Sequence, residues 1–113
     1  MSNEYPLIDQ RFLTENWAPE EDPELLAEAV AIFRTDSYDV IDAITQATQA
    51  GNALIVRQKS HYLKGGAGNL GAVRLAKLCD VIEGSARNGQ LPSAAQLQSL
   101  TEILGQTVKV LDP

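Results

Sequence analysis

The residue in this chain best suited to covalent chemistry is His61, its only histidine. A neutral imidazole nitrogen can attack phosphorus near neutral pH, and a nearby cation can offset the negative charge of the phosphoryl oxygens. Arg57 precedes His61 by about one helical turn, and Lys64 follows it by nearly one turn. These neighbours indicate a phosphoryl-accepting histidine, although an ordinary surface or core histidine beside a solvated charged face fits the same residues.

Glycines follow the histidine where the helical pattern continues, at Gly65, Gly66 and Gly68. Each interior glycine costs a helix about 1 kcal/mol relative to alanine, so this cluster calls for a compensating role. Gly65 and Gly68 come four and seven positions after His61, hence on its own face of a helix. We expect them to clear a surface on which a partner's backbone can approach the ring. The alternative is that the helix ends at Lys64 and the glycines form a loop.

Four long segments that could position this site show helical periodicity of apolar residues. They span about residues 22–50, 53–70, 72–88 and 93–111. The apolar positions expected in the core are Leu26, Val30, Phe33, Val40, Ile44, Ala47, Val56, Leu63, Ala67, Leu70, Ala72, Leu75, Cys79, Ile82, Ala86, Leu97, Leu100, Leu104 and Leu111. Short connections at three glycines make sequential neighbours antiparallel. The predicted fold is therefore all-α, an antiparallel up-down-up-down four-helix bundle with a short N-terminal helix.

Local signals set the helix ends. Asp22 followed by Pro23 is a strong helix start, and Ser93 with Gln96 three residues later forms a capping box. A break within the first long helix remains possible near residues 35 and 36.

The chain divides into an N-terminal arm, residues 1–20, and a bundle, residues 21–113. Leu7, Ile8, Phe12 and Leu13 predict a short amphipathic helix in the arm, which either caps the bundle or stays mobile. Trp17, the only tryptophan, is expected to anchor this segment.

Size and charge exclude several classes of function. With 113 residues, 44% of them hydrophobic, the chain suits one domain and is too short for a kinase. The net charge of −6 argues against a nucleic-acid partner. Residues 1–42 hold eleven acidic and two basic side chains, giving −9, whereas residues 43–113 hold four acidic and seven basic ones, giving +3. The part around His61 is therefore locally basic and could attract an anionic group or partner.

No segment indicates a membrane or a metal. Apolar runs fall short of the ~20 residues of a membrane span, and no signal peptide is visible, so a cytoplasmic or nuclear location is expected, with the cytoplasm preferred. Cys79 is the only cysteine, which rules out an internal disulfide. A metal-dependent hydrolase lacks clustered ligands.

Around His61 the sequence resembles the histidine-containing phosphotransfer (HPt) domain family of two-component phosphorelays. The family's pattern is met by His61-Tyr62-Leu63-Lys64-Gly65, by Leu70-Gly71-Ala72, and by Leu75, Cys79 and Glu83. One departure is Gly66, where the family often has serine or alanine.

The resemblance implies that His61 accepts a phosphoryl group from a receiver-domain aspartate and passes it to another receiver domain. Lys64 would stabilise the phosphoryl group, and Glu83 would orient the imidazole through its other nitrogen; a solvated surface carboxylate is the alternative for Glu83. We assign Arg57, Gln58, Gly65 and Gly68 to the partner-binding surface. Cys79 belongs on the apolar stripe and is expected in the core rather than as a nucleophile.

The resemblance also implies the partners: response-regulator receiver domains and a hybrid sensor kinase, with Mg²⁺ on the receiver and no cofactor in this chain. The protein would be a stoichiometric phosphocarrier rather than an enzyme, and a monomer. A noncovalent helical adaptor, which docks a partner without phosphorylation, is the alternative.

Overall fold

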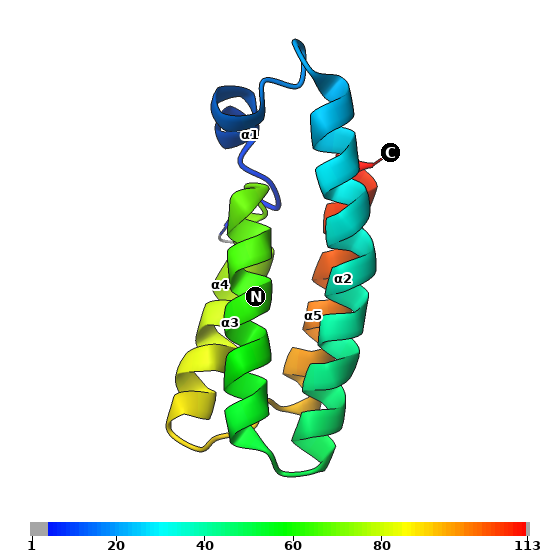
Figure 1. The fold of residues 1–113 in the computed structure, drawn as a ribbon. Coiled ribbons are helices and arrows are strands. Elements are labelled where there is room, and N and C mark those ends of the chain that lie inside the picture. Colours follow the sequence, from blue (N-terminus) through cyan, green and yellow to red (C-terminus); the bar gives the residue numbers. More distant parts are fainter. Residues whose placement is uncertain (1–4, 113) are drawn as a thin grey trace.

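The computed structural model describes residues 5–112 and is all-helical over that range (Figure 1). Its helices are α1 (Gln10–Trp17), α2 (Pro23–Gln49), α3 (Ala53–Asn69), α4 (Val73–Arg87) and α5 (Ala94–Leu111). Residues 1–4 of the predicted arm and residue 113 at the end of the predicted bundle lie outside the described residues. Among the helices from residue 5 to residue 112, none is both long and apolar enough to cross a membrane.

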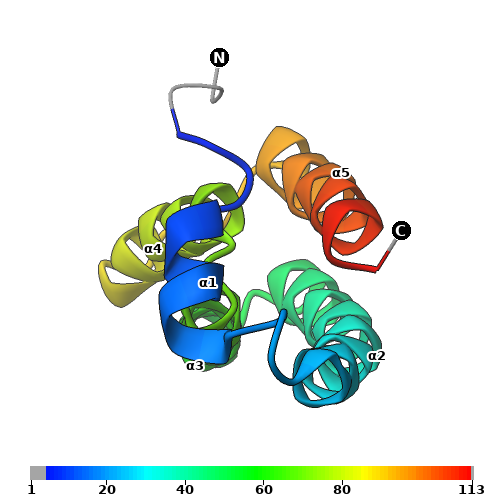
Figure 2. The same ribbon diagram turned by 90° about the horizontal axis from the view of Figure 1, so that it is seen from above.

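The four long helices form the predicted antiparallel bundle. Seen along its axis, they stand in a ring in the order α2, α3, α4, α5, and each contacts its two neighbours (Figure 2). Successive helices run in opposite directions because the connections between them are short. The up-down-up-down prediction is confirmed.

Side chains cap the helix starts as the sequence predicts. The Asp22 carboxylate accepts from the backbone N–H of Leu25, with Pro23 in the first turn. Ser93 and Gln96 form the capping box at the start of α5. Helix α2 is continuous through residues 35 and 36, so the possible break does not occur.

The core fills with the residues on the predicted apolar stripes. Most of them are buried, whereas Leu26, Leu97 and Leu111 are partly buried at the margin. Ile41 and Ile103 are further core residues that the pattern did not single out. Each long helix therefore packs one face against the core and leaves the opposite face exposed.

The short helix α1 lies across the end of the bundle where α3 meets α4 (Figure 2). The Trp17 indole N–H donates to the carbonyl of Asn69 at 2.8 Å, and the Asp9 backbone N–H donates to the carbonyl of Gly71 at 2.8 Å. Gly71 has φ +67°, and an added Cβ there would lie 3.1 Å from the Asp9 carbonyl oxygen. The part of the arm that the structure describes therefore caps the bundle, and Trp17 anchors it.

Candidate functional site

His61 stands on the outer face of α3, next to α4. Its helix turns Val56, Ser60 and Leu63 into the core, and this leaves the imidazole outside with 69% of its side chain exposed. Exposure agrees with the prediction that the ring is open to a partner. The reading as a core histidine is wrong.

Glu83 approaches the ring from α4 and is almost completely buried, with 5% of its side chain exposed. Its Oε2 lies 2.9 Å from Nδ1 of His61. An ionised carboxylate can only accept hydrogen bonds, so this contact requires the proton on Nδ1. In that tautomer Nε2 keeps its lone pair. Because Glu83 is buried, its reading as a solvated surface carboxylate is wrong.

Cations hold the Glu83 carboxylate in its charged form. The Lys64 ammonium lies 2.6 Å from Oε1, as an ion pair rather than a well-aligned hydrogen bond, and the Arg87 guanidinium donates to Oε2 at 3.1 Å. The Lys64 ammonium holds the pKa of Glu83 below its ordinary value; burial opposes this shift, and the His61 hydrogen bond supports it. The carboxylate can therefore keep its role as an acceptor for the ring.

Lys64 lies between two carboxylates. Besides Glu83, it contacts Asp80 at 3.2 Å, and about a third of its side chain (31%) is exposed. Glu83 and then Asp80 raise the pKa of Lys64 above its ordinary value. The ammonium thus stays charged close to His61, but it faces α4 carboxylates in this structure.

The glycines near His61 lie inside a continuous helix. Helix α3 runs to Asn69, so the alternative of a loop after Lys64 is wrong. A Cβ added at Gly65 or Gly68 would meet no atom within 4 Å. Both positions therefore leave open space on the His61 face, as the sequence predicts.

A hollow of about 440 Å³ opens on the other side of the ring, between α3 and α4. Its lining brings together the predicted residues Arg57, Gln58, His61 and Glu83, and adds Leu54 and Arg87. Lys64, Gly65 and Gly68 do not line it. His61 therefore separates an open, glycine-bearing surface from a hollow that carries two guanidinium groups.

The sequence reasoning did not single out Arg87 and Asp80. Both contact the site through α4, and their spacing from Glu83, four residues after and three before, places them on its face. That spacing is the signal that could have found them.

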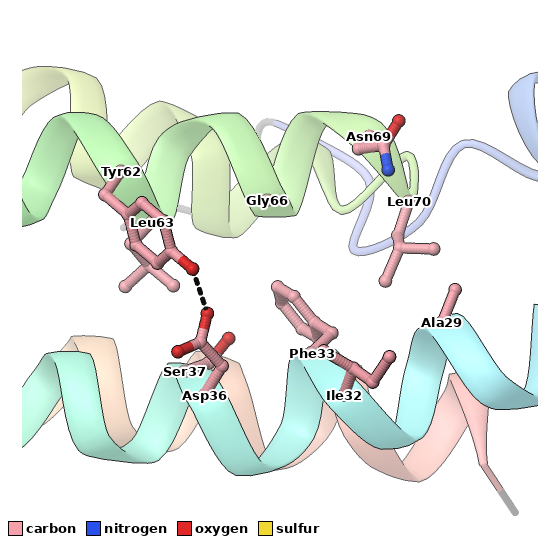
Figure 3. A pocket seen from close by; sticks show the side chains of 10 residues that line it. All are labelled: Ala29, Ile32, Phe33, Asp36, Ser37, Tyr62, Leu63, Gly66, Asn69 and Leu70. Carbon is pink, nitrogen blue, oxygen red and sulfur yellow. Dashed lines mark hydrogen bonds between the residues drawn. The ribbon is translucent and has the colours of Figure 1, made fainter.

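A second hollow, of about 300 Å³, lies between α2 and α3 (Figure 3). Apolar side chains such as Ile32, Phe33 and Leu63 line most of it, and the Tyr62 hydroxyl donates to Asp36 across it. This hydrogen bond raises the pKa of Tyr62. Tyr62 follows His61 in sequence but faces α2, and the two hollows share no lining residue.

Neither a metal centre nor a thiol competes with His61 as the chemical group. Within residues 5–112, no group of three or more His, Cys, Asp or Glu side chains is placed to hold a metal ion. Cys79 is fully buried, and burial raises the pKa of its thiol to about 12, so it is a core residue, as predicted.

Comparison with known proteins agrees with the site's chemistry. Residues 28–109 match the model of the Hpt domain family. The crystal structure of histidine-containing phosphotransfer protein B from Pseudomonas aeruginosa PAO1 superposes with a TM-score of 0.85 at 30% sequence identity, and the match covers 96% of this chain and 93% of that chain. No curated protein matches the sequence.

Proposed function

This chain belongs to the Hpt domain family, and from that membership we propose that it is a phosphorelay intermediate in which His61 accepts a phosphoryl group from a receiver-domain aspartate and passes it to another receiver domain. A histidine phosphotransfer role follows from the family. The assignment of that role to His61 rests on one observation, the exposed imidazole whose Nδ1 contacts the buried Glu83 carboxylate at 2.9 Å.

In the proposed first step, Nε2 of His61 is the nucleophile. Its lone pair attacks the phosphorus of the receiver's aspartyl phosphate, an N–P bond forms, and the acyl P–O bond breaks to return the aspartate carboxylate. Glu83 holds the proton on Nδ1 throughout and stabilises the positive charge that develops on the ring. In the second step, the carboxylate of another receiver attacks the phosphorus, and the N–P electrons return to Nε2.

The other predicted site residues take supporting roles in this proposal. Lys64 supplies positive charge near the ring, and Gly65 and Gly68 allow the receiver backbone to approach it. Arg57 and Gln58 lie in the adjoining hollow, where they can contact the docked receiver. Each of these roles depends on phosphorylation at His61.

The partner supplies what this chain lacks. We propose that the receiver carries the Mg²⁺ and most catalytic groups, so this chain acts as a stoichiometric carrier without a cofactor of its own. The receiver of a hybrid sensor kinase is the proposed donor. The proposal keeps the cytoplasmic location and the monomeric state expected from the sequence, which cell fractionation and size-exclusion chromatography can test.

The test is incubation with a radiolabelled, phosphorylated receiver domain and Mg²⁺. We expect an acid-labile, base-stable label on this chain that disappears in His61→Gln, whose fold should persist because position 61 is exposed. A label that persists in His61→Gln would contradict the proposal. A receiver that binds tightly but transfers no phosphate would favour the noncovalent adaptor, for which the open glycine surface is the supporting observation.

A further inference from the structure

The hollow beside His61 carries a pair of guanidinium groups. It lies between α3 and α4, with Arg57 on the first helix and Arg87 on the second. Arg57 precedes His61 by one helical turn on the same face. The Arg87 guanidinium donates to Oε2 of Glu83, and the same oxygen contacts Nδ1 of His61. The guanidinium and the imidazole therefore lie on either side of one carboxylate oxygen.

The α3–α4 hairpin explains why the two arginines meet. His61 and Glu83 each lie eleven residues from Ala72, and Lys64 and Asp80 each lie eight residues from it. Both pairs are in contact, at 2.9 and 3.2 Å, so residues equally distant from Ala72 lie level across the two helices. Arg57 and Arg87 are each fifteen residues away. They therefore face each other one turn beyond the His61–Glu83 pair.

The balance of charge differs between the two sides of His61. On the glycine side, the Lys64 ammonium lies between the carboxylates of Glu83 and Asp80. On the side of the hollow, Glu83 is the only carboxylate in the lining, and Arg87 pairs with it. Within the described part of the chain, no carboxylate pairs with Arg57. On the first side, Asp80 offsets the attraction of Lys64 for a dianionic phosphoryl group on the ring, whereas on the second side Arg57 has no carboxylate to offset it.

The guanidinium group is also suited to phosphoryl oxygens by its shape. It presents five N–H donors in a planar fork that can bind two oxygens at once, and Arg87 uses one terminal nitrogen on Glu83. More than half of its side chain (55%) is exposed, and the remaining donors can reach a group in the hollow. Leu54 is the one aliphatic side chain in the lining of the hollow, and the other lining residues carry polar groups.

We propose that Arg57 and Arg87 form the subsite that holds the phosphoryl oxygens on His61, and that Lys64 acts mainly by positioning Glu83. This inference rests on the proposed function and departs from the role that the family resemblance gives to Lys64. The two arginines become contact residues for the transferred group, whereas Lys64 becomes a positioning residue that acts through the carboxylate.

Phosphoramidate tests the subsite without any partner protein. The Nε2 lone pair attacks its phosphorus, the N–P bond of phosphoramidate breaks, and the nitrogen leaves as ammonia after taking up a proton from water. The rate constant for phosphorylation of the full chain can be followed by phosphorus NMR. The variants are Arg57→Gln, Arg87→Gln and their combination, and Lys59→Gln is the matched control, an exposed α3 cation outside the hollow.

We expect each arginine variant to react about tenfold more slowly than the wild type and the double variant more slowly still, with Lys59→Gln within about twofold. Lys64→Gln should instead shift the imidazole tautomer populations in nitrogen NMR spectra, because the restraint on Glu83 is lost. The Arg57→Gln spectrum should keep the wild-type tautomer. Circular dichroism verifies that every variant remains helical.

The outcomes separate this inference from the proposed function. If the wild type takes phosphate on His61 and both arginine variants match Lys59→Gln, the subsite is overturned and the proposed function stands. If Lys64→Gln alone slows the reaction and keeps the wild-type tautomer, Lys64 holds the phosphoryl group and the inference is wrong. If the wild type takes no phosphate on His61 from phosphoramidate or from a receiver, the proposed function fails, and the subsite fails with it.

Discussion

At the scale of single residues, Glu83 is unusual because its carboxylate is nearly fully buried. Burial of a charge is costly unless partners compensate it. Here His61 and Lys64 reach it from α3, and Arg87 reaches it from one turn further along α4. These contacts keep the carboxylate ionised and make it the acceptor that fixes the imidazole tautomer.

The first prediction concerns the replacement of Glu83. Glu83→Ala should slow phosphoryl transfer by about tenfold or more, because the ring loses the acceptor that holds its orientation and its Nδ1 proton. Glu83→Gln should keep most of the rate, since the amide oxygen can still accept from Nδ1. Transfer from a phosphorylated receiver measures both, with nitrogen NMR for the tautomer. Equal tautomer populations in the wild type and Glu83→Ala would contradict the role.

The second prediction uses the lowered pKa of Glu83. The folded protein binds this proton less tightly than the unfolded chain, whose carboxyl titrates near 4.5. The resulting stabilisation is complete above pH 4.5 and is lost as the pH falls through the lowered folded pKa. Carboxyl groups titrate between about pH 5 and about pH 3. Over this range, the free energy of unfolding of the wild type should therefore fall more steeply than that of Glu83→Gln. Urea denaturation across this range measures it, and parallel curves would refute the prediction.

The exposure of His61 could be predicted from the sequence, whereas the contacts of Lys64 and Arg87 could not. The helical spacing placed His61 off the core stripe, and the structure leaves it exposed. The contact of Lys64 could not be predicted, because its long side chain reaches either the solvent or the facing helix, and that choice depends on the register of α4. Arg87 was missed because its role depends on Glu83, one turn away on the same helix.

At the scale of the elements, α3 combines an unfavourable composition with a regular conformation. It contains three interior glycines, yet it remains helical to Asn69 because its apolar face packs against the core. Two of them, Gly65 and Gly68, lie on the face that carries His61, whereas Gly66 faces Phe33 of α2. This agrees with a surface kept free of side chains for a partner.

The third prediction sets stability against function at Gly65. A side chain there would lean toward the preceding turn, where His61 stands. Gly65→Gln should hold or raise the stability, by up to about 1 kcal/mol, because position 65 is helical and open. It should also reduce receiver binding and transfer.

Gly105→Gln is the matched control for this prediction. It replaces a helical glycine on α5, where an added Cβ meets only the Tyr38 hydroxyl at 3.8 Å. Its stability should change in the same direction, with transfer unaffected. Thermal melting and transfer assays measure both properties, and an unchanged transfer rate in Gly65→Gln would show that the glycine does not clear a docking surface.

The fourth prediction concerns the contact between α1 and the bundle. Gly71→Ala should destabilise the fold by about 1–3 kcal/mol, because alanine is strained at this positive φ and its Cβ would press on the Asp9 carbonyl and on Phe12. Gly89→Ala is the control, with φ +81° and no atom near the added Cβ. Urea unfolding followed by Trp17 fluorescence should show the larger loss for Gly71→Ala. Equal losses would mean that the contact with α1 adds nothing.

The elements themselves were largely predictable. Caps at Asp22 and Ser93 and the apolar stripes defined all four long helices, because local hydrogen bonds and a 3.6-residue period are properties of the chain alone. The continuity of α2 was left open, since residues 35 and 36 carry no apolar signal. The docking of α1 depends on contacts such as Trp17 with Asn69, which are 52 residues apart in sequence and not visible in local patterns.

At the scale of the whole molecule, the bundle places one reactive ring on an elongated body of 45 × 26 × 20 Å. The antiparallel α3–α4 hairpin places His61 level with Glu83. The site therefore depends on the arrangement of these two helices as well as on the sequence motif around His61. The charge distribution also has a global form, with −9 in residues 1–42 and +3 in residues 43–113. This distribution would steer an acidic partner surface toward the part of the chain that carries His61.

The central claim is that His61 receives the phosphoryl group on Nε2 while Glu83 holds Nδ1. Its most direct test is a nitrogen NMR spectrum of the chain with ¹⁵N-labelled histidine, recorded before and after exposure to a phosphorylated receiver domain and Mg²⁺. We predict phosphorus–nitrogen coupling at Nε2 of His61 and a proton retained on Nδ1. Phosphorus on Nδ1, or an unchanged ring spectrum while the receiver loses its phosphate to another residue of this chain, would contradict the account.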